Sequence, residues 1–256
     1  MHAAALPALA AAPGAWPAVL GALIANHAAL GLLGLAPGNR WIGPTLVRLP
    51  AAAAARREVA LTFDDGPHPA VTPRVLDLLD RRGARATFFC VGRRVKAHPD
   101  LVRDIAARGH AVENHSDRHE KRFALQTPWA IRRELRTAQT TLTAAAGTPP
   151  RFVRAPFGIR GPMLDPALAG TGLRHVAWTR RGKDTICNDP ALVLARLTRG
   201  LAAGDILLLH DGASAVGADG TPVVLTVLPA LLAALAAQGL HAVTLRAALD
   251  ADSRAV

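Results

Sequence analysis

Residues 61–67 read Leu-Thr-Phe-Asp-Asp-Gly-Pro, and this stretch decides how the rest of the chain is interpreted. From residue 59 to residue 63, large apolar residues alternate with smaller or polar ones, a pattern typical of a β-strand. Gly66-Pro67 then interrupts the strand. Asp64 and Asp65 therefore lie at its carboxyl end, where barrel-like α/β folds place their chemistry. Neighbouring side chains diverge at a strand end, so we expect the two carboxylates to have different roles.

Strand and helix patterns alternate through the rest of the chain. Further strands are predicted over residues 86–91, 109–114, 152–154, 175–179, 205–210 and 242–245. Helices are predicted over residues 72–83, 99–108, 128–146, 165–170, 190–203 and 222–238. Repeated strand-then-helix units call for a parallel sheet, either open or closed into a barrel. We find no repeat of fixed period, no glycine-rich phosphate loop and no dinucleotide-binding fingerprint.

Composition limits the partners of this protein. The 256 residues are 50% hydrophobic, enough for a large core, and carry a net charge of +11, mostly from arginine. This charge favours an anionic partner such as a membrane surface, a phosphorylated lipid or an anionic glycan. Nucleic acid is the weaker alternative, because the arginines are spread along the chain without a recognition motif. The two cysteines form no disulfide framework or zinc motif, although a single Cys90–Cys187 bridge stays open.

The first fifty residues differ from the rest. Residues 1–39 contain no Asp, Glu, Lys or Arg, and residues 18–36 are apolar and long enough to span a bilayer. Asn26 and His27 oppose insertion, and a signal peptide fits poorly because no basic residue precedes the apolar stretch. The alternatives are an interfacial helix or a hydrophobic hairpin against the catalytic domain.

We therefore expect an apolar segment and linker over residues 1–50, a low-complexity hinge over residues 51–55 and a catalytic domain over residues 56–250. The apolar segment predicts association with the inner (cytoplasmic) membrane. Arginines follow that segment, which favours a cytoplasmic catalytic domain.

A candidate metal site follows from the spacing of two histidines. His115 and His119 are four residues apart, so on one helical turn both imidazoles would face the same ion. A carboxylate from the Asp64-Asp65 strand end would complete a two-histidine, one-carboxylate site, which suits zinc or iron and leaves coordination positions open. His210 ends an apolar strand, and Arg154 and Asp184 lie near other strand ends, although each alone also fits a structural role.

Taken together, these residues resemble the polysaccharide deacetylases of the NodB-homology type (carbohydrate esterase family 4). The resemblance covers Glu58 to Leu249. Five blocks carry it, in order: residues 62–67 (TFDDGP), residues 115–119 (HSDRH), residues 154–157 (RAPF), Trp178 with Asp184, and residues 207–210 (LLLH). The first two blocks are the most specific.

The resemblance implies a distorted, incomplete (β/α) barrel. It implies that Asp65, His115 and His119 bind a divalent metal, usually zinc in this family. It further implies that Asp64 is the general base, that Arg154 pairs with it, that His210 is the general acid and that Asp184 orients His210. The backbone N–H of Phe157 would stabilise the oxyanion, and Trp178 and Leu208 would form the pocket for the acyl methyl group.

Two positions depart from the family pattern. Phe157 stands where the family usually has Tyr, and Thr185 follows Asp184 where the family usually has Trp. The segment of residues 179–183, Thr-Arg-Arg-Gly-Lys, is strongly basic. We expect Arg180 and Arg181 to meet an anionic group of the substrate, such as a lipid diphosphate or an acidic sugar.

The sequence as a whole predicts a membrane-associated, metal-dependent hydrolase that removes an N-acetyl group from an amino sugar of a glycan or glycolipid. Within hydrolases, O-deacetylation or deformylation of a lipid-linked sugar uses nearly the same groups. From other classes, a non-haem iron oxygenase shares the ligand set but has no use for a base, tether and acid. An inactive glycan-binding relative is disfavoured, because the polar groups of all five blocks are present.

Overall fold

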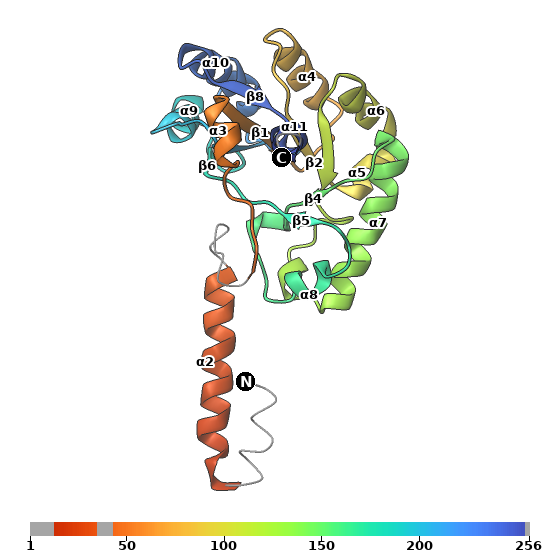
Figure 1. Cartoon of the computed structure of the whole chain (residues 1–256), viewed down its shortest axis with the longest axis vertical. Helices are drawn as coiled ribbons and strands as arrows, with labels where there is room; N and C mark the ends of the chain where they lie inside the picture. Colours follow the sequence, from red (N-terminus) through yellow and green to blue (C-terminus); the bar gives the residue numbers. More distant parts are fainter. Residues whose placement is uncertain (1–12, 35–42, 254–256) are drawn as a thin grey trace.

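The structure is a computed structural model that describes residues 13–34 and 43–253. Its centre is a parallel sheet of eight strands in the order β5-β4-β3-β2-β1-β7-β6, with β8 also paired to β1 (Figure 1). The strands are β1 (Glu58–Asp64), β2 (Thr87–Cys90), β3 (Ala111–Asn114), β4 (Phe152–Val153), β5 (Arg174–His175), β6 (Arg180–Arg181), β7 (Ile206–His210) and β8 (His241–Val243). Since the described sheet is open, this is the incomplete α/β barrel that the sequence predicts.

Helices α4 to α7, α9 and α10 pack together on one face of the sheet, and α3 and α11 pack on the opposite face. The helices are α2 (Trp16–Gly34), α3 (Ala51–Ala55), α4 (Thr72–Asp80), α5 (Gly92–Ala97), α6 (Pro99–Ala107), α7 (Pro128–Ala146), α8 (Leu164–Leu168), α9 (Pro190–Thr198), α10 (Val223–Ala237) and α11 (Leu245–Ser253). Three short 3₁₀ turns are η1 (Pro13–Ala15), η2 (Phe123–Leu125) and η3 (Pro156–Gly158).

Local signals explain where the main helices begin and end. The Thr127 hydroxyl caps α7 by accepting the Ala130 N–H, and Pro128 occupies the first turn. Gly147 ends the helix in the left-handed conformation, with φ of 74°. Asp189 caps α9 in the same way as Thr127 caps α7.

Strand β1 lies at the centre of the sheet, between β2 and β7. Residues 59–64 are buried on both faces, as expected for a central parallel strand under helices. Asp64 is in register with Phe89 on β2 and with His210 on β7. The sheet therefore brings Asp64 and His210 side by side at its carboxyl edge.

Several sequence expectations are wrong. Residues 51–55 form helix α3 rather than a hinge, because Ala53 is fully buried among Leu49, Ala60 and Phe89. Helices α5 and α11 and strand β6 are absent from the predicted pattern. The Cys90–Cys187 bridge, which the sequence only leaves open, is not formed, since both cysteines are free thiols.

The segment before α3 is also more ordered than a linker. Leu46 forms a parallel bridge with Val176 beside β5, and Leu49 is 4% exposed. We call residues 43–50 the N-terminal strap. Residues 35–42, which include the first part of the predicted linker, and residues 1–12 lie outside the described residues.

Helix α2 projects from the body of the molecule (Figure 1). Its end is joined to the domain by a hydrogen bond from the Arg160 N–H to the Gly34 carbonyl, at 3.0 Å. Within residues 13–34 and 43–253, no helix combines the length and apolar character needed to cross a membrane, so the expected spanning helix is not found there.

Candidate active site

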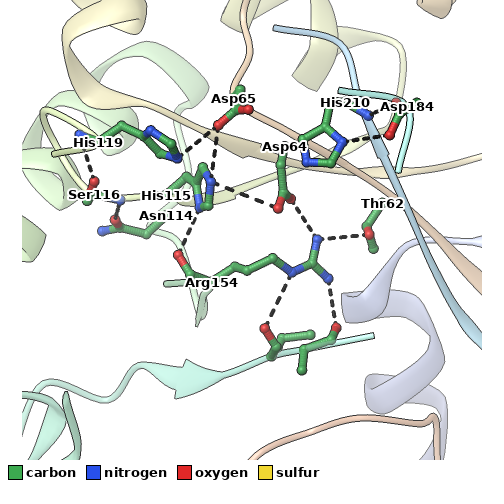
Figure 2. Close-up of polar contacts among 12 residues, drawn as sticks. Thr62, Asp64, Asp65, Asn114, His115, Ser116, His119, Arg154, Asp184 and His210 are labelled. Atoms are coloured by element: carbon green, nitrogen blue, oxygen red, sulfur yellow. Dashed lines mark hydrogen bonds and ion pairs between the residues drawn. The ribbon is translucent and has the colours of Figure 1, made fainter. Parts of the chain in front are cut away.

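The two adjacent carboxylates of the sequence face different partners. Asp64 is the last residue of β1, and Asp65 turns the chain with φ of 71°, in the left-handed region that non-glycine residues seldom adopt. This turn directs Asp64 toward Arg154 and Asp65 toward two histidines (Figure 2). The prediction of separate roles thus has a structural basis in the conformation of Asp65.

The two histidines approach Asp65 from a loop, not from the helical turn predicted by their spacing. Residues 115–119 follow β3 without helical structure, and Ser116 and His119 have φ of 62° and 54°. The Asn114 side-chain oxygen accepts the Ser116 N–H, and the Ser116 hydroxyl accepts the His119 N–H (Figure 2). These bonds fold the loop so that both imidazoles point to one place.

The arrangement of these three residues fits a divalent metal ion. The Nε2 atoms of His115 and His119 lie 3.3 and 3.0 Å from Oδ1 of Asp65, and one ligand atom from each residue falls within 4.8 Å of the others. That Oδ1 atom is buried and has no hydrogen-bond partner among the described residues. A buried oxygen without a partner, beside two ring nitrogens, is what an ion of the zinc type requires.

A hydrogen bond from the ring nitrogen that faces away from Asp65 fixes the orientation of His115. Its Nδ1 donates to the carbonyl of Arg154 at 2.8 Å, which leaves Nε2 as the ligand atom. Glu113, two residues before His115, bonds to Arg246 and accepts the backbone N–H groups of residues 151 and 152. Asn114 instead shapes the loop.

Electrostatics at the triad favour a cation. Burial opposes ionisation of Asp65, but His115 and His119 outweigh it and hold the pKa of this carboxyl well below its usual range. Burial likewise opposes protonation of His115, but Asp64 and Asp65 raise its pKa. Burial and the nearby His115 lower the pKa of His119 to about 4. Protons and a metal ion would therefore compete chiefly at His115.

Asp64 is held by a buried guanidinium. Nη1 of Arg154 donates to Oδ1 of Asp64 at 2.6 Å and to the hydroxyl of Thr62 at 2.9 Å. Nη2 of Arg154 donates to the carbonyl of Ala177 at 2.9 Å, and its guanidinium carbon lies 4.1 Å from the centre of the Phe89 ring. Arg154 is 1% exposed, so burial lowers its pKa while Asp64 opposes this shift. The participation of Thr62 is not predictable from residue spacing, because its partner Arg154 is distant in the chain.

His210 faces the site from β7 and is oriented by Asp184. Oδ1 of Asp184 accepts from the His210 Nδ1 at 2.8 Å, and Oδ2 accepts the His210 backbone N–H, also at 2.8 Å (Figure 2). Burial opposes protonation of His210, but the hydrogen bond and charge of Asp184 raise its pKa. His210 is thus prepared to act as an acid.

A pocket of about 440 Å³ opens above these groups. Trp178, Leu208 and Phe157, to which the family resemblance assigns acyl and oxyanion roles, line this pocket. Phe157 has φ of 59°, and its ring lies 4.5 Å from that of His119. Strained backbone of this kind is concentrated at functional sites.

Three arginines also line the pocket: Arg93, Arg94 and Arg181. Sequence reasoning missed Arg93 and Arg94, which lie on the short helix α5. It also treated Arg180 and Arg181 as one cationic patch, and this is wrong. They are neighbours on β6, so their side chains point to opposite faces. Arg180 pairs with Asp205 and donates to the carbonyls of residues 199 and 200, whereas Arg181 lines the pocket.

Comparison with known proteins shows which family this chain resembles. The sequence pattern described as polysaccharide deacetylase matches residues 51–176. A chitooligosaccharide deacetylase of Bradyrhizobium sp. (strain ANU 289) is 36% identical over 157 residues, which cover 61% of this chain and 71% of that protein. The chain belongs to the polysaccharide deacetylase family. As a member of this family it is a hydrolase that deacetylates carbohydrates.

Other members of the family show how widely the fold is used. The peptidoglycan-N-acetylglucosamine deacetylase PgdA of Listeria monocytogenes (strain EGD-e) is 31% identical, over 68% of this chain and 37% of that protein. A solved family 4 carbohydrate esterase from Streptomyces lividans, in complex with acetate, superposes with a TM-score of 0.65 at 30% identity. That likeness covers 72% of this deacetylase and 91% of the other chain.

Proposed function

We propose that this polysaccharide deacetylase hydrolyses the N-acetyl group of an amino sugar, of the N-acetylglucosamine type, in a chitooligosaccharide or a peptidoglycan-like glycan. The observation that carries the proposal is the pair of opposed groups on either side of one pocket. Asp64 faces Arg154, and His210 faces Asp184. Relatives named for chitooligosaccharide and for peptidoglycan N-acetylglucosamine support this substrate class.

Asp65, His115 and His119 would hold the metal, with zinc the best match to one oxygen and two nitrogen donors. When bound there, such an ion would polarise the amide carbonyl and lower the pKa of a water molecule. The remaining chemistry belongs to side chains of this chain.

Asp64 acts as the general base and removes a proton from the attacking water. Arg154 keeps the Asp64 carboxylate oriented and ionised through the 2.6 Å contact. The water oxygen bonds to the acetyl carbon while the carbon–nitrogen bond breaks. His210 gives its proton to the departing amine, so the products are acetate and a free amino sugar.

The geometry disfavours the other classes considered from the sequence. An iron oxygenase would use the metal ligands, but its chemistry would not require the buried Asp64–Arg154 and Asp184–His210 pairs. An inactive binding protein would need neither pair. O-deacetylation and deformylation use the same groups, and only substrates distinguish them.

The test is acetate and formate release by the full chain, metal-stripped and then given zinc. The substrates are N-acetylated chitooligosaccharides, peptidoglycan fragments, and O-acetylated and N-formylated sugars. We expect zinc-dependent acetate release from the N-acetylated glycans. Asp64→Asn should lower kcat by roughly 10²- to 10⁴-fold, the usual contribution of a general base. The matched control Asp77→Asn removes an exposed carboxylate of α4 and should leave the rate unchanged. Release from O-acetyl or N-formyl sugars alone would contradict the proposal.

A further inference from the structure

Arg181 is a cationic group of the pocket that the proposed reaction does not use. Arg181, on β6, lines the pocket from the side of β7 and His210, because β6 pairs with β7 at the edge of the sheet. Its neighbour Arg180 is engaged in structural contacts on the opposite face. Among the described residues, the Arg181 side chain forms no hydrogen bond or ion pair, and its Nε atom is buried without a partner.

The position of Arg181 is fixed by Trp178. The guanidinium carbon of Arg181 lies 5.4 Å from the centre of the indole ring. The ring itself packs against the backbone at Gly158, where even an added Cβ atom would collide with it. The guanidinium is therefore held against a rigid wall of the pocket with its donors unoccupied. A group of this kind is suited to bidentate contact with a carboxylate or phosphate.

The carboxylates of the pocket are already engaged elsewhere. Asp64 is paired with Arg154, and Asp65 faces the two histidines. On the opposite side, beyond β1, the exposed Arg93 adds a second cation, and its side chain also makes no hydrogen bond or ion pair within the described residues. Beside His210, the carboxylate of Asp184 is occupied by the ring and backbone of His210, so neither it nor the other carboxylates is paired with Arg181.

We propose that Arg181 and Trp178 form an anion subsite, and that the physiological substrate carries a carboxylate or phosphate on the N-acetylated sugar or on the residue next to it. The inference rests on the proposed function, since it names the substrate class of the same pocket. Arg181 binds the oxyanion through its free N–H donors, and Trp178 supports the guanidinium and the sugar face. The uncharged chitooligosaccharides become the poorer substrates of this enzyme.

The test compares three ligands that share N-acetylglucosamine: the neutral chitooligosaccharide, an oligosaccharide with adjacent glucuronate, and N-acetylglucosamine 1-phosphate. Binding is measured by calorimetry on the zinc-loaded full chain in an Asp64→Asn background, which prevents turnover. Attraction of the anion to the zinc is common to all variants, so a difference between variants reports Arg181 alone. The glucuronate and phosphate arms show which oxyanion the subsite prefers.

Arg181→Gln should weaken binding of at least one anionic ligand by roughly tenfold or more, as expected for losing a charge-assisted hydrogen bond. Binding of the neutral ligand should change by less than about twofold. Arg181→Lys keeps the charge but loses the planar guanidinium, so its affinity for the anionic ligand should lie between that of the unchanged protein and that of Arg181→Gln. It replaces Arg181→Gln in the test if that variant does not fold. Arg136→Gln removes the same charge from the exposed face of α7 and should change nothing.

Equal loss for neutral and anionic ligands would overturn the subsite, as would the same loss in Arg136→Gln. Acetate release from the three ligands is measured separately, with the enzyme that retains both Asp64 and Arg181. If zinc-loaded protein releases no acetate from any of the three ligands, the proposed function fails. Even then, the difference in anion affinity between Arg181→Gln and the protein that retains Arg181 decides whether the anion subsite exists.

Discussion

At the scale of single residues, the proposed general acid, His210, depends on one carboxylate, Asp184. Asp184 accepts two hydrogen bonds from His210, one from the ring and one from the backbone, and it is fully buried. Because Asp184 raises the pKa of His210 against the effect of burial, it keeps the imidazole protonated at a higher pH than it would otherwise be.

Asp184→Asn should therefore lower the pKa of His210 and move the alkaline limb of the kcat/KM profile to lower pH. The loss of activity should be small on the acid side, where His210 stays protonated, and larger above neutral pH. A pH-rate profile measures this, with His210→Gln as the reference that has no acid. An equal loss at every pH would show that Asp184 only maintains the structure.

At the scale of elements, the two-residue strand β6 places two adjacent arginines on opposite faces of the sheet, where they have different partners. Arg180 reaches Asp205, which is 0% exposed and also lies 2.5 Å from Arg48. Arg181, on the opposite face, lines the pocket. Neighbours in the sequence are thus predicted to have different mutant phenotypes.

Arg180→Gln should lower the free energy of unfolding by about 1–3 kcal/mol, since it weakens the pairing of a buried carboxylate. The preference for anionic over neutral ligands should stay the same. Urea unfolding and the binding series described for Arg181 check both parts. A stable Arg180→Gln protein with altered ligand preference would reverse the assignment of the two side chains.

At the scale of the whole molecule, metal binding should couple to folding. The triad draws ligands from the ends of β1 and β3, which are separated in the sheet by β2. Zinc at about 100 times its Kd should stabilise the fold by about 2.7 kcal/mol, and hence raise Tm by roughly 5–10 °C for a chain of this size.

His119→Ala should remove most of this shift, while His241→Ala, on an exposed position of β8, should not. The zinc-induced shift should shrink as the pH falls, because the raised pKa of His115 lets protons compete with the metal from a higher pH. Thermal unfolding with and without zinc, over a range of pH, measures both effects. A shift that persists in His119→Ala would place the ion elsewhere.

Much of the site could be predicted because its residues stand at strand ends. Asp64, Arg154 and His210 follow apolar runs, and parallel strands bring such ends to one edge. The loop of residues 115–119 could not be predicted, since its shape depends on left-handed residues and side-chain bonds rather than on a repeating pattern.

Other features depend on tertiary partners. The division between Arg180 and Arg181 requires knowing that β6 is a strand, yet only two residues form it. Residues 51–55 are low in complexity, and their helix is explained by the packing of Ala53 against the core. Thr62 and the carbonyl of Arg154 act through neighbours distant in the chain, which spacing alone does not reveal.

The N-terminal strap has a practical consequence for anyone who shortens this protein. Leu46 donates its N–H to the His175 carbonyl and accepts the Ala177 N–H, at 3.0 and 2.9 Å, and so covers the outer side of β5. Without the strap, that side of the sheet would present unpaired backbone groups, which promote edge-to-edge aggregation. A fragment of residues 51–256 should form large particles in light scattering, whereas one of residues 43–256 should not. Equal particle sizes would show that the edge needs no such cover.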